Sequence, residues 1–405
     1  MYKSIIKNII SLSALKMVDL VIPLIILPYL IITVGKENYG IYAFAYTFIF
    51  YFLNVTQYGF SLSAVKHVAL IRDDKNKLAN YFNEILTTKL FLTCITIGVI
   101  ILLTLVVPKF RDNNLVILFV SLMLVGDCFT PIWYFQGIEK MQFITFANII
   151  SKLTYLVFVY FWITSKDDYV YIGLYQSIGF ILSGIISIVY VVRYHKIKLQ
   201  IKGFSHIKKN LKEGFSSFLI LTIPTLYANT SIFLLGMFTP FQNVTLLEAG
   251  TKISSVFSAF STILARALYP FLNRNQQHKK MMVKVQIILG FLASLIMFLS
   301  APLVIKLWFR NGLMNDVILV IKILSATPFL LSIIYAFGIN GLLVENKDKL
   351  FLKATIIAST VGLILGVLLI PNGDYLIAAV VIILSRALYA LSTFLFHSTR
   401  LNTLK

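Results

Sequence analysis

Long apolar runs without a charged residue recur along the chain and alternate with short segments that hold most of the lysine and arginine. Leu90–Pro108 and Tyr169–Val192 are two such runs, each close to the roughly 20 residues that a helix needs to cross a bilayer core. The pattern predicts an all-α polytopic membrane protein with about twelve transmembrane helices. The predicted spans cover about residues 8–33, 38–62, 83–106, 114–136, 143–164, 169–192, 214–238, 247–271, 285–307, 317–343, 350–370 and 374–397.

The predicted span over residues 247–271 has a polar line along one side. At 100° per residue, the residues that fall within about 40° of this line are Glu248, Lys252, Ser255, Ala259, Thr262 and Arg266. Bulky apolar residues such as Phe257 and Leu264 occupy the other side. The line runs roughly 27 Å at 1.5 Å rise per residue, which is nearly the thickness of a bilayer core. It therefore predicts one wall of a polar passage through a membrane.

Composition supports the membrane class, because 59% of the 405 residues are hydrophobic and only 13% are charged. The net charge of +20 would suggest a nucleic-acid partner until the charges are placed. If the N-terminus is cytoplasmic and residues within three positions of a span end are counted with the adjoining loop, the inner loops and termini hold 23 of the 36 Lys and Arg, the outer loops 6 and the span interiors 7. The positive-inside rule then predicts that both the N- and C-termini are cytoplasmic, and nucleic acid is not an expected partner.

The longest predicted connection, residues 193–213, is rich in basic residues and separates six predicted spans from six. It predicts an N-terminal six-helix bundle over 1–192, a cytoplasmic basic linker over 193–213 and a C-terminal six-helix bundle over 214–405. The linker charges are most simply a topology signal that faces anionic lipid head groups. No soluble domain, phosphate-binding glycine loop or cleavable signal peptide is expected. The cysteines and histidines do not have metal-ligand spacing, so no metal is expected. A cofactor and catalytic residues are not expected either.

Ionisable residues inside the predicted spans are the strongest functional candidates, because each costs roughly 2.5–3.5 kcal/mol to insert into a bilayer. More than three residues from either end of these spans, there are seven cations and only two acids, Asp19 and Asp127. This excess of positive charge predicts an anionic guest. The cations expected to bind it are Arg266, Arg386, Lys152 and Lys252, and the remaining three are Lys16, Lys89 and Lys322. Arginine suits phosphate oxygens best, because its planar fork donates two hydrogen bonds at once.

Alternative interpretations of these charges remain open. Lys16, Lys89 and Lys322 lie within reach of an interface and are also explained by snorkelling. Asp127 and Lys152 lie at similar depth on consecutive predicted spans and would either pair or line the passage. Lys252 would either bind the guest or pair with Glu248 one helical turn away.

Other polar residues at helical positions are expected to line the passage beside these charges. They are Glu248, Ser255, Thr262, Asn148, Tyr155, Asn229 and Asn340. Asp19 and Asp127 are the candidates for ion coupling, because no histidine is expected at mid-membrane. Trp133 and Trp308 are interpreted as interfacial anchors, since they lie near predicted span ends.

Several short motifs resemble the Wzx-type polysaccharide flippases of the multidrug/oligosaccharidyl-lipid/polysaccharide (MOP) exporter superfamily. The clearest is Phe135-Gln136-Gly137-Ile138-Glu139-Lys140-Met141, followed by Asn148 and Lys152. Tyr39–Ala43 and Leu369–Pro371 fit the same family. The likeness covers the whole chain in length. Val244–Ala249 departs from it, because it lacks the glycine and tyrosine expected there.

The resemblance implies two six-helix bundles around a central cationic cavity and alternating access driven by an ion gradient. The implied cargo is an undecaprenyl-diphosphate-linked oligosaccharide, such as an O-antigen repeat unit, moved from the inner to the outer leaflet of the bacterial cytoplasmic membrane. A polysaccharide polymerase and a chain-length regulator are the protein partners that this role implies.

Two other functions compete with a flippase. A multidrug or cation antiporter of the same superfamily should carry buried acids for a cationic guest, which is the opposite of the observed charge excess. A membrane polysaccharide polymerase or glycosyltransferase should have a large loop with paired carboxylates. The carboxylate pair Asp73-Asp74 instead lies in a short loop beside lysines and is more simply a solvated turn.

Overall fold

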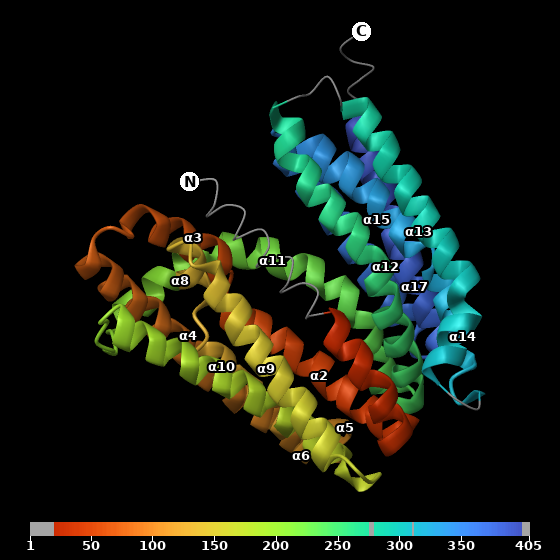
Figure 1. The fold of residues 1–405 in the computed structure, drawn as a ribbon, viewed down its shortest axis with the longest axis horizontal. Coiled ribbons are helices and arrows are strands. Elements are labelled where there is room, and N and C mark those ends of the chain that lie inside the picture. Colours follow the sequence, from red (N-terminus) through yellow and green to blue (C-terminus); the bar gives the residue numbers. More distant parts are fainter. Residues whose placement is uncertain (1–19, 275–278, 310–311, 399–405) are drawn as a thin grey trace. The chain divides into compact units, whose positions relative to one another are not determined.

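The computed structural model describes residues 20–274, 279–309 and 312–398, and within these residues the regular structure is entirely helical (Figure 1). The chain forms two compact units, Met1–Thr222 and Ile223–Lys405. The helices that lie wholly in unit 1 are Leu20–Val34, α2 (Lys36–Gln57), α3 (Phe60–Ile71), α4 (Lys75–Val106), α5 (Pro108–Arg111), α6 (Asn114–Ser121), α7 (Met123–Cys128), α8 (Ile132–Gly137), α9 (Met141–Trp162), η1 (Asp167–Tyr171) and α10 (Ile172–Tyr194).

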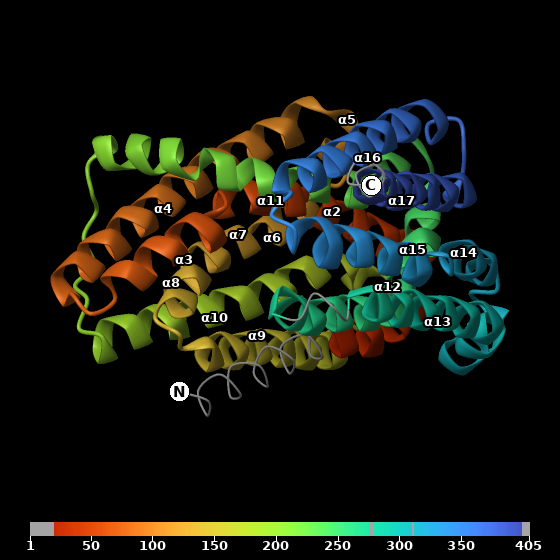
Figure 2. The same cartoon turned by 90° about the horizontal axis from the view of Figure 1, so that it is seen from above.

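Helix α11 (Phe204–Phe238) contains the boundary between the two units. The helices of unit 2 that follow it are α12 (Phe241–Arg274), α13 (Lys279–Trp308), α14 (Asp316–Leu324), α15 (Thr327–Ile333), the π-helical segment η4 (Ile334–Leu343), α16 (Asp348–Leu369) and α17 (Tyr375–Ser398). In both units, neighbouring helices pack side by side, as α9 and α10 do in unit 1 and α16 and α17 in unit 2 (Figures 1 and 2).

Eight helical segments among the described residues are long and apolar enough to cross a membrane. They are Lys75–Val106, Asn114–Gly137, Met141–Trp162, Asp167–Tyr194, Lys279–Trp308, Asp316–Leu343, Asp348–Leu369 and Tyr375–Ser398. The remaining predicted spans overlap Leu20–Val34, α2, α11 and α12. The all-α membrane class is therefore confirmed, whereas the number of twelve crossings stays a prediction.

The predicted span over 38–62 is wrong at its end, because α2 stops at Gln57 and a new helix starts at Phe60. Tyr58 and Gly59 between them have left-handed backbone angles, with φ of 44° and 70°. A Cβ atom on Gly59 would lie 2.4 Å from the backbone nitrogen of Phe218 in α11. Only glycine allows this close approach, so the break depends on a tertiary contact as well as on local sequence.

Helix α4 begins at Lys75, eight residues before the predicted start of its span. Asp74 caps it by accepting hydrogen bonds from the backbone N–H groups of Asn76 and Lys77, at 3.1 and 3.0 Å. The bonds from Lys77 are the main cause of the lowered pKa of Asp74. Asp74 is thus the N-cap residue of α4. This structural role agrees with the interpretation of the Asp73-Asp74 pair as a turn and not as a catalytic pair.

The segment between α10 and α11 is shorter than the predicted linker, because α11 already begins at Phe204. Figure 2 shows this segment running from the end of α10 to the start of α11. Asn83 of α4 holds it with both side-chain atoms, donating to the carbonyl of Lys198 at 2.9 Å and accepting from the N–H of Gln200 at 3.0 Å. Asn210 of α11 adds a bond to Thr88 at 3.1 Å. These bonds fasten the basic segment to α4.

Trp133 belongs to the core of unit 1, and its interpretation as an interfacial anchor is wrong. Its side chain is buried between Phe82 of α4 and Tyr134 of α8, with ring centroids 5.6 and 6.0 Å away. Sequence position near a span end suggested the anchor. The short helix α8 instead turns this part of the chain into the core.

Gly126 is required for the contact between α7 and α10. A Cβ atom at this position would lie 2.3 Å from the backbone carbon of Phe180. We expect Gly126→Ala to destabilise the protein by about 1–3 kcal/mol, because either helix must move to accommodate the methyl group. Thermal unfolding in detergent measures the effect.

Gly98 of α4 is the matched control, because a Cβ atom there would meet nothing within 4 Å. Gly98→Ala should be neutral or stabilising by up to about 1 kcal/mol, as expected from helix propensity. Equal unfolding temperatures for the two alanine variants would contradict the close-contact explanation.

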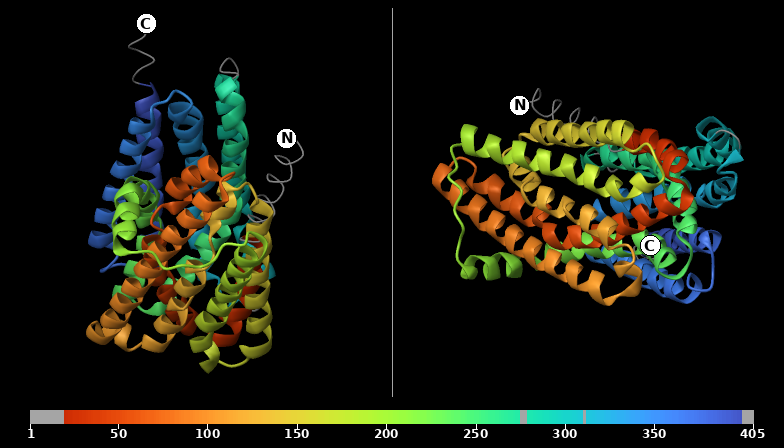
Figure 3. Two further views of the ribbon diagram at one scale, coloured as in Figure 1. Left: turned by 90° about the vertical axis from the view of Figure 1, so that its left-hand side faces the viewer. Right: turned by 90° about the horizontal axis from the view of Figure 1, so that it is seen from below.

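In unit 2, α12 packs through a line of small residues that differs from its predicted polar line. Ser254 and Ser261 are buried and donate to the carbonyls of Leu324 and Pro328, at 3.5 and 3.2 Å. Gly250 lies against Val320 of α14 on the same side. The small residues face the neighbouring helices α14 and α15, which leaves Ser255 exposed on another side of α12. Figure 3 shows the helices of unit 2 in two further views.

Candidate functional site

Unit 1 contains a buried ion pair between two spanning segments. Lys89 Nζ in α4 lies 3.0 Å from Asp127 Oδ2 in α7 and also donates to the Asp127 carbonyl at 2.8 Å. The side chains are 4% and 6% exposed. Gln57 at the end of α2 donates to the second carboxylate oxygen at 3.1 Å. Three helices therefore position one carboxylate, and the interpretation of Lys89 as a snorkelling residue is wrong.

Two cavities meet at this ion pair, and we call the pair, Gln57 and both cavities the Asp127 site. The smaller cavity, about 50 Å³, is lined by Gln57, Ser61, Lys89, Asp127, Thr130, Ile132 and Trp133. The larger one, about 150 Å³, is lined by Asp127, Thr130, Ile132, Ile144, Asn148, Ser151, Lys152, Phe180 and Ser183. Each exceeds the roughly 10–15 Å³ that one water molecule needs, so both can be hydrated.

The sequence-based candidates Asp127, Lys152 and Asn148 come together at this site. Asp127 is paired with Lys89, whereas Lys152 lines the larger cavity. Lys89 and Gln57 were not chosen from the sequence as site residues. The depth of Lys89 beside a long uncharged run was the available signal, because a lysine so far inside a span requires a partner.

Tyr155 takes part in another buried network of unit 1. Its hydroxyl donates to the hydroxyl of Tyr42 at 3.3 Å, and Tyr42 donates to Gln176 at 2.8 Å. Tyr155 and Gln176 come from the adjacent helices α9 and α10, so this chain of bonds joins them to α2. A role of Tyr155 in lining a passage stays a prediction.

In unit 2, the interpretation of Glu248 and Lys252 as an ion pair is confirmed, with 3.1 Å between Lys252 Nζ and Glu248 Oε1. Their side chains are 12% and 31% exposed, and a role of Lys252 in binding a guest stays a prediction. Thr262 on the same helix donates to the Tyr335 hydroxyl at 3.3 Å. Asp19 and the side chain of Arg266 lie outside the described residues.

Arg386 in α17 is half-buried and donates from Nη1 to Thr327 Oγ1 at 2.6 Å. Thr327 is buried and begins α15, directly before Pro328. The threonine therefore fixes one side of the guanidinium without neutralising its charge. Thr327 was not identified from the sequence, because a threonine in an apolar run gives no specific signal.

Asn340, another sequence-based candidate, lies fully buried in η4 and donates to Gln286 of α13 at 2.9 Å. This amide pair joins two elements of unit 2, which favours a packing role. Asn229 is half-buried in α11. Lining of a passage by Asn340 and Asn229 stays a prediction.

A second charged group lies at the connection between η4 and α16 in unit 2. Glu345 accepts from Lys279 and Lys347, and His397 Nε2 lies 3.3 Å from its carboxylate. Burial alone would raise the pKa of Glu345, but the hydrogen bonds from the two lysines outweigh it and lower the pKa to about 2. The group ties α13 and α17 to the connection between η4 and α16.

This pKa predicts a pH-dependent stability. A depressed pKa in the folded state stabilises the protein above the unfolded value of 4.5, and the contribution is lost as the pH falls toward 2. The Glu345→Gln variant should therefore be less stable at pH 7 and lose less stability between pH 4.5 and pH 3. Thermal unfolding of both proteins at each pH measures this difference. Parallel pH curves for the two proteins would contradict it.

Charged residues and cavities large enough for water lie inside apolar helices of spanning length, an arrangement typical of membrane transporters. Comparison with known proteins identifies the kind. A family model described as polysaccharide biosynthesis protein matches residues 5–276. The chain belongs to this family.

Two sequence relatives support the assignment. A protein of Escherichia coli (strain K12) named "Putative O-antigen transporter" is 29% identical over 367 residues, which is 89% of this chain and 88% of the relative. A protein of Shigella dysenteriae with the same name is 28% identical over 275 residues, 66% of this chain and 67% of the relative.

Solved structures show the fold. The lipid II flippase MurJ in an inward closed conformation has a TM-score of 0.76 at 13% identity, covering 96% of this chain and 87% of MurJ. An inward-facing multidrug resistance MATE family transporter of the MOP superfamily has a TM-score of 0.68 at 14% identity, covering 98% of each chain. The resemblance to the polysaccharide flippases of this superfamily is confirmed. The protein is a transporter of that family and not an enzyme, which removes the polymerase and glycosyltransferase alternatives.

Proposed function

We propose that this protein moves an undecaprenyl-diphosphate-linked oligosaccharide, the repeat unit of an O-antigen or a related surface polysaccharide, from the cytoplasmic to the outer leaflet of the bacterial inner membrane. The observation that carries this proposal is the similarity, over 89% of the chain, to the Escherichia coli protein named "Putative O-antigen transporter". The excess of cations over acids in the predicted spans supports an anionic lipid as cargo.

In unit 2, Arg386 is the foremost candidate to bind the diphosphate. Its contact with Thr327 orients the guanidinium, and the planar fork of this group suits phosphate oxygens. Lys252 adds positive charge on α12, moderated by Glu248. Arg266 is proposed for the same role on its sequence position alone.

In unit 1, Lys152 is the proposed contact for the cargo, and Asp127 the proposed carrier of the coupling proton. Asp127 lies against both cavities, which are large enough for water, and a proton on its carboxyl would weaken the pair with Lys89. The change in charge would shift the balance between two arrangements of α4 and α7. Asp19 is the second candidate, and sodium is the alternative coupling ion.

The topology that fits this function has both termini in the cytoplasm, twelve crossings, a six-helix bundle over 1–192, a linker over 193–213 and a second bundle over 214–405. The distribution of Lys and Arg supports this arrangement. A polysaccharide polymerase and a chain-length regulator are the proposed partners. The central cationic cavity stays a prediction.

Gene deletion and complementation test the proposed function. Loss of the protein should remove surface polysaccharide while lipid-linked repeat units accumulate on the cytoplasmic side, and the intact gene should restore export. Drug resistance is the comparison, because an antiporter of the same superfamily would alter it. Unchanged polysaccharide with altered drug resistance would overturn the flippase proposal in favour of the antiporter.

A further inference from the structure

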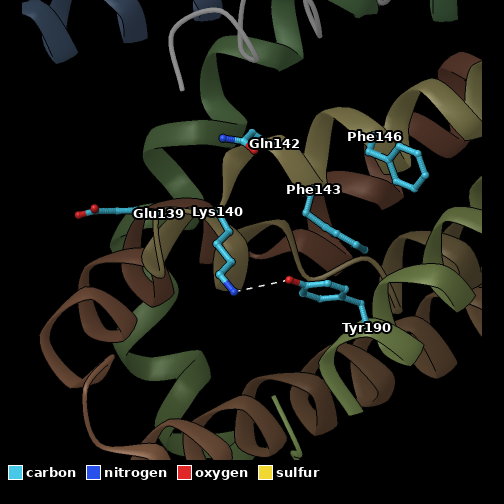
Figure 4. A pocket seen from close by; sticks show the side chains of 6 residues that line it. All are labelled: Glu139, Lys140, Gln142, Phe143, Phe146 and Tyr190. Carbon is cyan, nitrogen blue, oxygen red and sulfur yellow. Dashed lines mark hydrogen bonds between the residues drawn. The ribbon is translucent and has the colours of Figure 1, made fainter. Parts of the chain in front are cut away.

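The connection between α8 and α9 forms an open cavity that the transport mechanism above does not use. Figure 4 shows its lining by Glu139, Lys140, Gln142, Phe143, Phe146 and Tyr190. Its volume is about 480 Å³, the largest among the cavities described above. Lys140 belongs to the motif Phe135–Met141, so the fold gives this motif a definite place at the mouth of the cavity.

The ammonium group of Lys140 contacts neutral side chains. Its Nζ lies 3.2 Å from His195 Nε2 and 3.5 Å from the Tyr190 hydroxyl (Figure 4 shows the second contact). The neighbouring Glu139 forms an ion pair with Arg72 at 2.6 Å. Among the described residues, no carboxylate oxygen lies within salt-bridge distance of Lys140.

His195 is prepared to accept from the lysine. Burial and the charge of Lys140 lower the pKa of His195, which favours the neutral ring. With Nε2 accepting from Lys140, the Nδ1–H group donates to the Tyr134 hydroxyl at 2.6 Å. These two hydrogen bonds orient the ammonium group of Lys140 and leave its positive charge available to an anion.

Three of the lining residues are aromatic and lie on spanning helices. Phe143 and Tyr190 stack with ring centroids 4.3 Å apart, one from α9 and one from α10. Phe146, one turn further along α9, is 55% exposed. Both helices are apolar enough to span the membrane, so the cavity has a cation at the end of a span and exposed aromatic surface beside it.

We propose that this cavity binds the phosphate-bearing head group of a membrane lipid, with Lys140 contacting the phosphate and Phe143, Phe146 and Tyr190 contacting the adjoining part of the lipid tail. The combination of cation and apolar surface distinguishes a lipid from a soluble anion, which would use the cation alone. The Phe135–Met141 motif is thereby assigned to lipid binding at the cytoplasmic end of unit 1.

The test uses the full-length protein in dodecyl maltoside micelles, which contain no phosphate. A photoreactive phosphatidylglycerol with a diazirine near its head group is titrated, and labelling of the peptides that contain Phe143, Phe146 and Tyr190 is quantified. Lys140→Ala should weaken half-maximal labelling by about tenfold or more, the value expected for losing a charge-assisted contact. Lys140→Arg should retain it.

Lys77→Ala is the matched control, since Lys77 is an exposed lysine of the same unit that pairs with Asp74. It should label as the wild type does. A phosphate-free diacylglycerol probe should label the same peptides at least about tenfold more weakly. Unchanged labelling of Lys140→Ala, or equal labelling by the diacylglycerol probe, would overturn the proposal. Displacement of the lipid by an equal concentration of inorganic phosphate would identify a soluble anion as the ligand and would also overturn it.

Discussion

Replacement of Lys89 by methionine is expected to destabilise the protein by about 3–5 kcal/mol, because it leaves the Asp127 carboxylate buried without its cation. The pair is less than a tenth exposed, so bulk solvent compensates little for the lost ammonium group. Gln57 would remain as a neutral donor to the carboxylate. Thermal unfolding of the purified protein in detergent measures the loss.

The double variant Lys89→Met with Asp127→Leu separates stability from transport. Replacing both buried charges by apolar residues is often neutral or stabilising, so this variant should regain most of the lost stability. It should nevertheless remain inactive in export if Asp127 carries the coupling proton. A folded and fully active double variant would remove Asp127 from the mechanism.

The exposed pair of Lys77 and Asp74 is the matched control for the buried pair. The Lys77 side chain is 73% exposed, and an exposed pair is worth only about 0–1 kcal/mol. Lys77→Met should therefore change the unfolding temperature little. An equal loss of stability in Lys77→Met and Lys89→Met would contradict the role given to burial.

The second large effect is expected at Arg386, where alanine should reduce export roughly ten- to hundredfold. This range follows from the roughly 1.5–3 kcal/mol of a hydrogen bond to a charged group. Lysine should preserve part of the activity, because it keeps the charge but loses the planar fork. Lipid-linked repeat units accumulated at the cytoplasmic face, normalised to protein level, provide the measurement.

Two further variants distinguish substrate binding from packing at this position. Thr327→Val removes the acceptor that orients Arg386 and should lower export less than Arg386→Ala does. Lys322→Ala is the control in the same unit, since Lys322 lies 5.5 Å from the Phe298 ring centroid and is not among the proposed cargo contacts. Normal export by Arg386→Ala would exclude this arginine from the transport site.

The membrane class, the positions of most helices and the presence of charges inside the spans could be predicted from the sequence. The pairing of those charges could be predicted only within one helix. Glu248 and Lys252 lie one turn apart, and the helical repeat alone brings them together. The partner of Asp127 was harder to predict, because Lys89 is 38 residues away and lies on another helix.

Helix ends show the same division between local and tertiary information. Asp74 caps α4 by accepting hydrogen bonds from residues two and three positions later, so such a cap can be predicted from the sequence. The break after Gln57 combines the left-handed residues Tyr58 and Gly59 with the backbone of α11 lying against Gly59, and no local pattern encodes that second contribution. The burial of Trp133 has the same origin, since α8 places this residue in a core built from distant helices.

The sequence by itself determined that this chain is a helical membrane protein whose spans contain more cations than acids, because hydropathy and charge count are properties of the residues and need no partner. The tertiary structure decided which charges are paired, which line cavities and which remain available to an anion. A charged group inside a membrane is stable only with a partner or water nearby, and helices distant in sequence supply both. Lys89 and Lys140 illustrate the outcome: packing pairs the first with a carboxylate and leaves the second among neutral groups at an open cavity.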